Sequence, residues 1–368
     1  MSRLVVVGGG LAGAKAAEAA AGEGWDVVVV GDEPHAPYER PPLSKDVLRG
    51  EKESEPVHAE PPYDLVTGTR VVGLDPAARR VHLDDGRELA YDAAVLATGT
   101  SPRRLGIPGG ERLRYFRTVD DARTLREAAS PGTRVAIVGA GWIGCEVAAS
   151  LRQAGAEVVL VDPMPGPLHR VLGAEVSGVF ARLHERHGVT LRMGSGVEAV
   201  TEQGVVLAGG DVVPADLVVA GVGVVPNVEV ATGAGLDVDD GVLTDELLRT
   251  SAIGVYAAGD VANAWHPRYR ARLRVEHWAN ALNQGTAAGR NATGRAEPYE
   301  RLPYFFSDQY DLGMEYVGHG APTDEVTIEG DDSAFVAWWK RDGRVTAAMH
   351  VNTWDIADDL RKAVDADL

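Results

Sequence analysis

The fold is decided by the stretch Leu4-Val5-Val6-Val7-Gly8-Gly9-Gly10-Leu11-Ala12-Gly13. Its apolar residues predict a buried strand, and its glycines predict a tight turn into a helix over about 11–22. In such a motif the first glycine allows the turn, the second lets the backbone approach a pyrophosphate, and the third lets helix and strand pack closely. The free N–H groups of the helix N-terminus attract the phosphates. The predicted dinucleotide contacts are Gly8, Gly10, Leu11, Ala12 and Gly13.

A second copy of this device follows further along the chain, in Val135-Ala136-Ile137-Val138-Gly139-Ala140-Gly141-Trp142-Ile143-Gly144. Each copy is followed by another valine-rich strand and then by an acid about 20 residues on, the distance at which a carboxylate accepts a ribose hydroxyl. These acids are Asp32 and Asp162. One glycine motif alone is weak evidence, whereas two complete βαβ units predict two dinucleotides and therefore two redox carriers. The second set of contacts is Gly139, Gly141, Trp142, Ile143 and Gly144.

The rest of the chain repeats this layout. Apolar strands that end in glycine turns are expected at 91–99 and 217–223, so the chain contains two related modules. Another buried strand, 250–260, ends at Asp260, and ligands of open α/β sheets gather at such carboxyl ends. After about Glu297 the pattern changes to short β-rich segments, which indicates a small third domain.

The composition excludes several classes of protein and of functional site. The chain has 368 residues, 45% of them hydrophobic and 24% charged, which suits a globular protein of two or three domains. Its net charge of −18 argues against nucleic acid and against anionic membrane surfaces, and no apolar run predicts a membrane span. Cys145 is the only cysteine, so a disulfide, a dithiol mechanism and a cysteine zinc cluster are all excluded, and no metal site is predicted. We expect a cytoplasmic protein in which Cys145 fills packing space.

The motifs, taken in order, resemble those of the flavoprotein reductases that supply electrons to ferredoxins in bacterial Rieske dioxygenase and P450 systems, and they are similar to those of apoptosis-inducing factor. The glycine motifs are shared with many flavoproteins, whereas PYERPPLSK and FFSDQYDLG are specific. The matching segments, which span nearly the whole chain, are GGGLAG (8–13), PYERPPLSK (37–45), ATGTSPR (97–103), GAGWIGCEVA (139–148), GVGVVPN (221–227), YAAGDVA (256–262), EHWANALNQG (276–285) and YFFSDQYDLGMEYVG (304–318).

The resemblance implies an α/β fold with two Rossmann-like dinucleotide-binding domains of the glutathione-reductase type and a small α+β C-terminal domain. The expected FAD domain is 1–113 plus 241–297. The expected NAD domain is 114–240, and 298–368 would form one wall of the flavin site. The implied cofactors are FAD and NADH.

Lys45 and Glu146 are the expected catalytic pair. By resemblance, Arg40 and Lys45 contact the FAD phosphates and the flavin, where a lysine stabilises negative charge on the reduced ring. Glu146 would hold that ammonium in place, since a buried lysine without a partner tends to lose its proton. The alternatives are a surface lysine and a surface carboxylate on a helix.

Trp278 is the third expected catalytic residue, because it resembles the family tryptophan that stacks on the flavin or gates the nicotinamide; the alternative is a core tryptophan. Glu276 is expected at the nicotinamide amide. Asp32 is expected at the adenosine ribose and Asp260 at the ribityl chain; a helix N-cap at Asp260 is the other interpretation, and the two are compatible. The remaining expected cofactor contacts are Glu33, Ala97, Thr98, Gly99, Gly221, Val222, Gly223, Gly259 and His277.

The acid Asp162 favours NADH, because a carboxylate accepts the 2′-hydroxyl and repels a 2′-phosphate. The following Pro163-Met164-Pro165 offers no cation for NADPH, while Arg170 is a weak signal in the opposite direction.

The expected activity is that of an FAD-dependent NADH:ferredoxin oxidoreductase, which takes hydride from NADH and passes electrons singly to a [2Fe–2S] ferredoxin serving an oxygenase or P450. An acidic ferredoxin would dock on a local basic cluster; the alternative is a solvated loop. The cluster consists of Arg268, Arg270, Arg272 and Arg274. Two other functions stay open: the same chemistry with oxygen, a quinone or a small biosynthetic substrate as acceptor, and a redox-responsive binding protein. A monomer and a homodimer are both compatible with the sequence.

Overall fold

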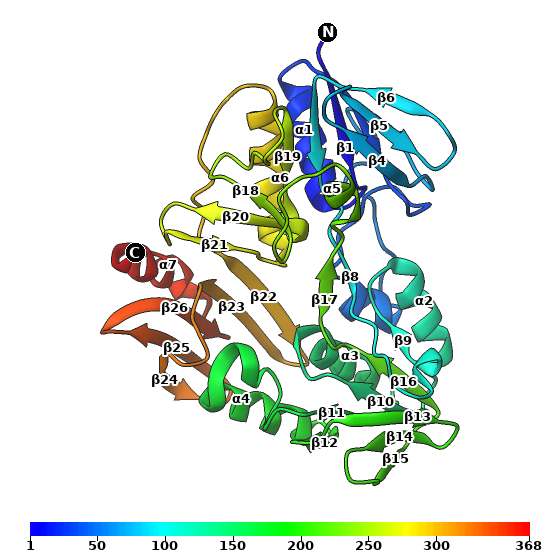
Figure 1. Ribbon diagram of the computed structural model, residues 1–368. Helices are drawn as coiled ribbons and strands as arrows, with labels where there is room; N and C mark the ends of the chain where they lie inside the picture. Colours follow the sequence, from blue (N-terminus) through cyan, green and yellow to red (C-terminus); the bar gives the residue numbers. More distant parts are fainter. The chain divides into compact units, whose positions relative to one another are not determined.

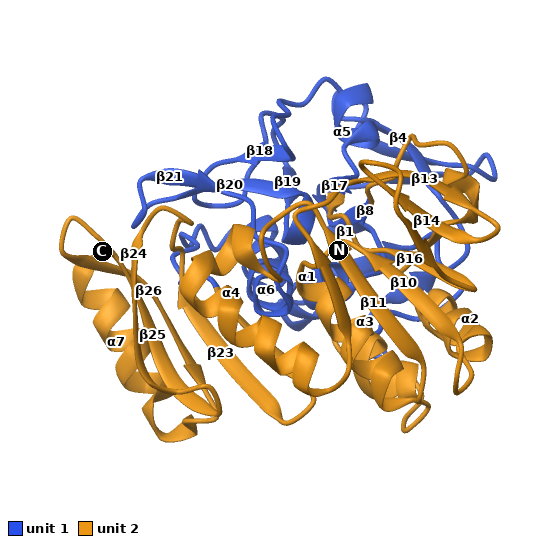
Figure 2. Cartoon of the chain, turned by 90° about the horizontal axis from the view of Figure 1, so that it is seen from below, with its two compact units in different colours: residues 1–39, 55–101, 225–303 blue, residues 40–54, 102–224, 304–368 orange.

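The computed structural model describes all residues, Met1–Leu368, and divides into two compact units, each built from several stretches of chain (Figure 2). Unit 1 consists of Met1–Glu39, Glu55–Ser101 and Val225–Pro303. Unit 2 consists of Arg40–Ser54, Pro102–Val224 and Tyr304–Leu368.

Unit 1 is built on a five-stranded parallel sheet in the order β19-β7-β1-β2-β3. Its valine-rich central strands are buried on both faces, as strands of a parallel sheet covered on both sides must be. The strands are β1 (Arg3–Val7), β2 (Asp26–Val30), β3 (Asp64–Val66), β7 (Ala93–Leu96) and β19 (Val255–Ala257).

Helices α1 (Leu11–Gly22) and α6 (Trp278–Ala292) pack against each other in unit 1 (Figure 1). Glycines of α6 make the close approach possible. A Cβ on Gly285 would lie 2.3 Å from the carbonyl oxygen of Ala12, and a Cβ on Gly289 would lie 2.2 Å from that of Ala16. The two helices are therefore in backbone contact.

Smaller sheets complete unit 1. An antiparallel β-meander is formed by β4 (Val71–Asp75), β5 (Arg80–Leu83) and β6 (Glu88–Ala90), and a second three-stranded sheet by β18 (Val242–Thr244), β20 (Ala262–His266) and β21 (Ala271–Leu273). Strands β8 (Thr100–Pro102) and β17 (Val224–Pro226) pair with each other. The short helical elements of this unit are α5 (Glu229–Gly233) and η3 (Gly259–Val261).

Unit 2 repeats the parallel design, with strand order β12-β11-β10-β16-β9. Its strands are β9 (Arg114–Tyr115), β10 (Arg134–Val138), β11 (Glu157–Asp162), β12 (Thr190–Met193) and β16 (Leu217–Ala220). Its helical elements are α2 (Val119–Ala128), α3 (Trp142–Gln153), α4 (His169–Arg186), η1 (Leu43–Val47) and η2 (Gly110–Arg112). A small antiparallel sheet is formed by β13 (Val197–Thr201), β14 (Gly204–Leu207) and β15 (Val212–Pro214).

The C-terminal part of unit 2 is an antiparallel five-stranded sheet in the order β22-β23-β26-β25-β24, which leaves β22 at an edge. The strands are β22 (Tyr304–Gln309), β23 (Leu312–Gly318), β24 (Glu325–Asp331), β25 (Ala334–Arg341) and β26 (Arg344–Val351). After the turn η4 (Trp354–Ile356), helix α7 (Ala357–Asp367) packs on β26 and β23.

The expected fold class is confirmed: two parallel α/β sheets, each with a glycine turn into a helix, precede a small C-terminal domain. The first helix begins and ends where the sequence predicts. The strand expected over 250–260 is shorter, because Gly254 adopts a positive φ of 79° in a turn before β19. None of the helices combines the length and apolar character that a membrane crossing requires.

Candidate functional site

The turn between β1 and α1 is a cradle that only glycine can form. Gly8 has a φ of 119°, and a Cβ there would lie 2.2 Å from the carbonyl oxygen of Ala97. A Cβ on Gly13 would lie 2.0 Å from the Gly8 carbonyl oxygen, whereas a Cβ on Gly10 would meet nothing within 4 Å. The turn is therefore closed at Gly8 and Gly13 and open at Gly10.

The turn between β10 and α3 has the same geometry in unit 2. Gly139 has a φ of 103°, and its Cβ would lie 2.3 Å from the carbonyl oxygen of Gly221. A Cβ on Gly144 would lie 1.9 Å from the Gly139 carbonyl oxygen, and Gly141 again faces open space. Both cradles fit the pyrophosphate of a dinucleotide. Ala97 and Gly221, which the sequence predicted as cofactor contacts, directly follow β7 and β16, the strands next to β1 and β10.

The carboxylate of Asp162 fixes the second cradle. It accepts the backbone N–H of Ala140 at 2.7 Å and that of Met164 at 2.8 Å, one on each oxygen. Each carboxylate oxygen has two lone pairs, so Asp162 retains capacity for a ribose hydroxyl. The corresponding Asp32 of unit 1 is exposed, and its Oδ2 lies 3.7 Å from Nη2 of Arg70. The carboxylate of the next residue, Glu33, accepts a hydrogen bond from the Tyr38 hydroxyl.

Two polar connections organise the strand ends of unit 1. The Thr98 hydroxyl donates to the backbone oxygen of Asn227 at 2.7 Å, and the Asn227 amide donates back to the Thr98 carbonyl at 2.8 Å. Thr100 donates to the carboxylate of Asp260 at 3.1 Å, and the Gly259 N–H donates to Gln284 at 3.0 Å. Asp260 lies inside η3, whose N-cap is Ala258, so the N-cap alternative for Asp260 is wrong.

Lys45 and Glu146 form a buried ion pair in unit 2, with 2.8 Å between Nζ and Oε2. The two residues are 9% and 5% exposed, which excludes the surface alternatives for both. Lys45 Nζ also lies 3.3 Å from the carbonyl oxygen of Pro41 and 5.9 Å from the ring centre of Phe306. Two serines, Ser44 and Ser307, donate to the carboxylate of Glu146 as well.

The segment that carries Lys45 is anchored to the loop before α2 and to helix α3, both in unit 2. Its Arg40 donates to the carbonyl oxygen of Arg117 at 2.6 Å, and the Ser150 hydroxyl of α3 donates to the carbonyl oxygen of Ser44 at 2.6 Å. Sequence reasoning assigned Arg40 to FAD; its contact with Arg117 leaves that role a prediction.

Glu276, His277 and Trp278 lie together where α6 begins, with His277 as its N-cap and Trp278 as its first residue. Both aromatic residues are half-buried, while Glu276 is exposed and accepts a hydrogen bond from the guanidinium of Arg274. Arg274 also pairs with Asp240 at 3.1 Å. The expected roles of these residues at the flavin and the nicotinamide stay predictions.

The basic cluster divides into two parts. The charge of Arg274 is used within unit 1, as just described, and Arg272 donates to the backbone oxygens of Thr244 and Asn263 at 2.8 and 3.0 Å. Arg270 is exposed, and Arg272 lies opposite the exposed Trp265 in the β20–β21 ladder. Arg272 is the one arginine of the cluster within β21, which contains only Ala271–Leu273, and Arg270 lies in the turn before it.

Cys145 is fully buried in α3, and its thiol donates weakly to the Ala140 carbonyl at 3.5 Å. Burial, with the nearby Glu146 carboxylate, strongly raises the pKa of the Cys145 thiol. The residue therefore fills space, as expected, and supplies no thiolate nucleophile.

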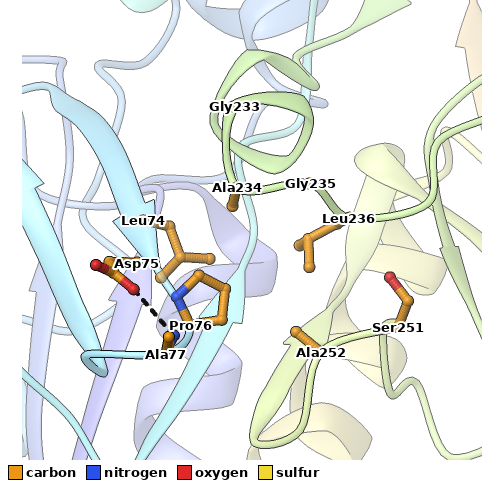
Figure 3. A pocket seen from close by; sticks show the side chains of 10 residues that line it. All are labelled: Leu74, Asp75, Pro76, Ala77, Gly233, Ala234, Gly235, Leu236, Ser251 and Ala252. Atoms are coloured by element: carbon orange, nitrogen blue, oxygen red, sulfur yellow. Dashed lines mark hydrogen bonds between the residues drawn. The ribbon is translucent and has the colours of Figure 1, made fainter.

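A surface depression of about 530 Å³ lies elsewhere in unit 1, between the β4–β5 turn and the loops around α5 (Figure 3). It contains none of the residues described above. Its lining is mostly small and apolar: Leu74, Asp75, Pro76, Ala77, Gly233, Ala234, Gly235, Leu236, Ser251 and Ala252. Oδ1 of Asp75 accepts the N–H groups of Ala77 and Ala78 in the turn itself, and the Ser251 hydroxyl oxygen accepts the N–H of Asp237.

Sequence reasoning missed Ser44, Ser307 and Asn227 as members of the site. All three lie inside segments singled out for the resemblance, PYERPPLSK, FFSDQYDLG and GVGVVPN. Their membership of these three segments was the available signal.

Comparison with known proteins agrees with this geometry. Residues 2–285 match the pyridine nucleotide-disulphide oxidoreductase family, and residues 304–367 match the reductase C-terminal domain. The chain belongs to the pyridine nucleotide-disulphide oxidoreductases. Membership implies FAD and NAD(P)H as cofactors, which the two glycine cradles fit, and makes the protein an oxidoreductase.

Named relatives within the pyridine nucleotide-disulphide oxidoreductases are reductase components. The ferredoxin–NAD(+) reductase component of the anthranilate 1,2-dioxygenase system of Burkholderia cepacia is 40% identical over 369 residues, covering 95% of this chain and 90% of that protein. Putidaredoxin reductase of Pseudomonas putida is 36% identical, covering 95% and 88%. Among solved structures, a covalent putidaredoxin reductase–putidaredoxin complex matches with a TM-score of 0.94 and 33% identity, covering all of this chain and 94% of that one.

Proposed function

We propose that this protein is an NADH:ferredoxin oxidoreductase that serves an oxygenase or a P450. The observation that carries the proposal is the pair of glycine cradles in one chain, which fits two dinucleotides at once. When bound, the flavin accepts hydride from the nicotinamide and releases its electrons one at a time. The relatives named for ferredoxin reduction support the choice of acceptor.

The residues of this chain bind and orient the cofactors. The cradle at Gly8 and Gly13, with Asp32 at the ribose, is proposed to hold FAD, together with Thr98 and Asp260 at the neighbouring strand ends. The cradle at Gly139 is proposed to hold NADH. Trp278 and Glu276 are proposed to act at the reacting rings, in the roles the resemblance implies.

Lys45 is proposed to place a positive charge at the flavin. Glu146 keeps the ammonium paired and in one position, because the pair is buried with 2.8 Å between the charged atoms. A fixed cation stabilises negative charge on a reduced ring without reorganisation. The proposed domain boundaries remain 1–113 with 241–297 for FAD, 114–240 for NAD and 298–368 for the C-terminal domain.

The nicotinamide donor is proposed to be NADH. Asp162 brings a carboxylate to the end of β11, beside the second cradle, where it would repel a 2′-phosphate. Arg170 is exposed on α4 and lies 3.9 Å from the sulfur of Met164. One exposed guanidinium does not outweigh a carboxylate held by two backbone N–H groups.

The partner is proposed to be an acidic [2Fe–2S] ferredoxin that docks on the β20–β21 hairpin. Its exposed arginines are Arg270 and Arg272. Trp265, which lies opposite Arg272 in the ladder and is 39% exposed, adds an apolar contact surface. Arginine and tryptophan are the residues that concentrate binding energy at interfaces. Arg274 is excluded from this surface, since Asp240 and Glu276 neutralise it.

The acceptor is tested by NADH turnover with and without a purified [2Fe–2S] ferredoxin. We expect the rate to rise well above the rate with oxygen alone. If ferredoxin adds nothing while a quinone does, the same fold serves another acceptor. If turnover stays slow with every acceptor and NADH changes the oligomeric state, the protein is a redox-responsive binding protein.

A further inference from the structure

The carboxylate of Glu146 receives more donors than its pairing with Lys45 requires. Its Oε2 accepts from Lys45 Nζ at 2.8 Å and also from the Ser44 hydroxyl. Its Oε1 accepts from the Ser307 hydroxyl at 2.7 Å. Both oxygens of the Glu146 carboxylate are therefore held. Ser44 and Lys45 of η1 contact Oε2, and Ser307 of the edge strand β22 contacts Oε1.

A chain of hydrogen bonds continues behind Ser307. The Gln309 amide N–H donates to the Ser307 hydroxyl oxygen at 3.3 Å, and the Gln309 amide oxygen lies 3.0 Å from Nε2 of His184. Because an amide oxygen only accepts, His184 carries its proton on Nε2. Every donor in the chain from α4 to α3 thus points toward the Glu146 carboxylate, and such aligned bonds strengthen one another.

The hydrogen-bond chain formed by Ser307, Gln309 and His184 is shielded from solvent, and none of its three side chains is charged. Ser307 and Gln309 are each 1% exposed and His184 is fully buried. Burial lowers the pKa of His184 to about 4, so its imidazole is neutral near pH 7.

The alternation of β22 explains how the sequence builds this chain. Phe305, Ser307 and Gln309 are buried on one side of the strand, while Asp308 between them is exposed. A buried polar group destabilises a fold unless it is hydrogen-bonded. Two polar residues at successive inward positions of one strand therefore need a structural or functional reason. Packing alone would be served by apolar residues at 307 and 309.

We propose that Ser307, backed by Gln309 and His184, is a positioning residue for electron transfer: it orients the Glu146 carboxylate, which in turn holds the Lys45 ammonium in one place. The proposal rests on the proposed function, in which Lys45 acts at the flavin. Ser307 itself touches neither cofactor in this scheme. Its effect reaches the flavin only through the position of a charge.

The experiment compares the FAD-bound wild-type protein with Ser307→Ala, Ser307→Thr and the control Ser177→Ala. Ser177 is a similarly buried serine, 3% exposed, which lies on α4 and is not part of the hydrogen-bond chain behind Glu146. The readout is the midpoint potential of the bound flavin, measured with a chemical reductant, together with the rate of anaerobic flavin reduction by NADH and the thermal unfolding midpoint.

We expect Ser307→Ala to favour the oxidised flavin about tenfold, which for a two-electron couple is a potential lower by about 30 mV. Reduction by NADH should slow in parallel. Ser307→Thr keeps the hydroxyl and should restore the wild-type potential. Ser177→Ala should leave the potential unchanged, although it removes the same atom from a buried site.

A wild-type potential in Ser307→Ala, or an equal shift in Ser177→Ala, overturns the proposal. If Ser307→Ala does not fold, Gln309→Met takes its place, since methionine fills a similar volume without the amide; an unshifted potential in that variant overturns the proposal too. Failure of the proposed function looks different, because the wild-type flavin would then not be reduced by NADH, while its potential could still be compared chemically.

Discussion

Asp162 fixes the conformation of the second glycine turn and also sets its charge. Two backbone N–H groups hold its carboxylate, from Ala140 within the glycine turn and from Met164 just after β11. This double anchoring leaves the negative charge no freedom to swing away from an incoming nucleotide. Discrimination against a 2′-phosphate is therefore expected to depend on this charge more than on any other single group.

Replacing Asp162 by Asn should weaken the preference for NADH. The amide removes the charge and retains one acceptor oxygen for the turn. We expect the ratio of kcat/KM for NADH to that for NADPH to fall about tenfold, equivalent to about 1.4 kcal/mol. Asp162→Glu, which keeps the charge, is the matched control and should retain the preference. An unchanged ratio in Asp162→Asn would show that other groups choose the nucleotide.

Among single residues, the sequence predicted those tied to local motifs, and the resemblance supplied the distant pair Lys45 and Glu146, but the serines that contact Glu146 were missed. Asp32 and Asp162 were singled out because their distance from a glycine turn is set by one βαβ unit, and their roles at the ribose stay predictions. Ser44 and Ser307 meet Glu146 across sequence separations of 102 and 161 residues. No local pattern encodes such a meeting, which arises only once η1, α3 and β22 are packed.

Among the elements, α1 and α6 depend most directly on glycine. Gly285→Ala should destabilise the protein by about 1–3 kcal/mol, because the added methyl would overlap the backbone of Ala12 and force the helices apart. Gly22→Ala is the control within α1, where a Cβ meets nothing within 4 Å and alanine is the better helix former. Chemical denaturation of both variants measures the difference. Equal stability of the two would contradict the backbone contact.

The parallel strands and the first helix were predictable because buried valine runs and glycine turns are strong local signals. The docking role of the basic cluster stays a prediction. Its hairpin is short, Arg270 lies in a turn with a φ of 50°, and Arg274 turns toward two carboxylates. Arg274 pairs with the nearby carboxylates of Asp240 and Glu276, and a sequence pattern does not show which of several nearby charges will pair.

For the whole molecule, His184 couples stability to acid. Folding lowers its pKa from 6.5 to about 4, so its contribution to stability is present above pH 6.5 and is lost as the pH falls toward 4. Between pH 7 and pH 4 the free energy of unfolding of the wild type should fall by up to about 3 kcal/mol more than that of His184→Gln. Urea titrations at several pH values measure this.

The control for acid stability is His82→Gln, at a histidine whose side chain is 39% exposed on the β-meander. This variant should follow the wild-type pH dependence. If His184→Gln follows it as well, folding does not lower the pKa of His184, and the imidazole at the end of the hydrogen-bond chain to Glu146 becomes charged as soon as the pH falls below about 6.5.

Docking of an acidic ferredoxin should depend on the charge of the β20–β21 hairpin. Arg270→Glu is expected to raise the KM for ferredoxin about five- to tenfold at low salt, and the difference should shrink at high salt as the charges are screened. Arg290→Glu, an equal charge reversal on the exposed end of α6, is the control. A KM that rises equally in both variants would indicate net charge as the cause, and an unchanged KM would place the docking surface elsewhere.

We propose that this one chain holds FAD and NADH for direct reaction, and the decisive experiment is an anaerobic titration of the purified protein with NADH. The protein should be yellow, and its flavin absorbance should bleach on addition of NADH and return on addition of oxidised [2Fe–2S] ferredoxin. A polypeptide that stays colourless when offered FAD, or a bound flavin that neither NADH nor NADPH bleaches, would contradict it.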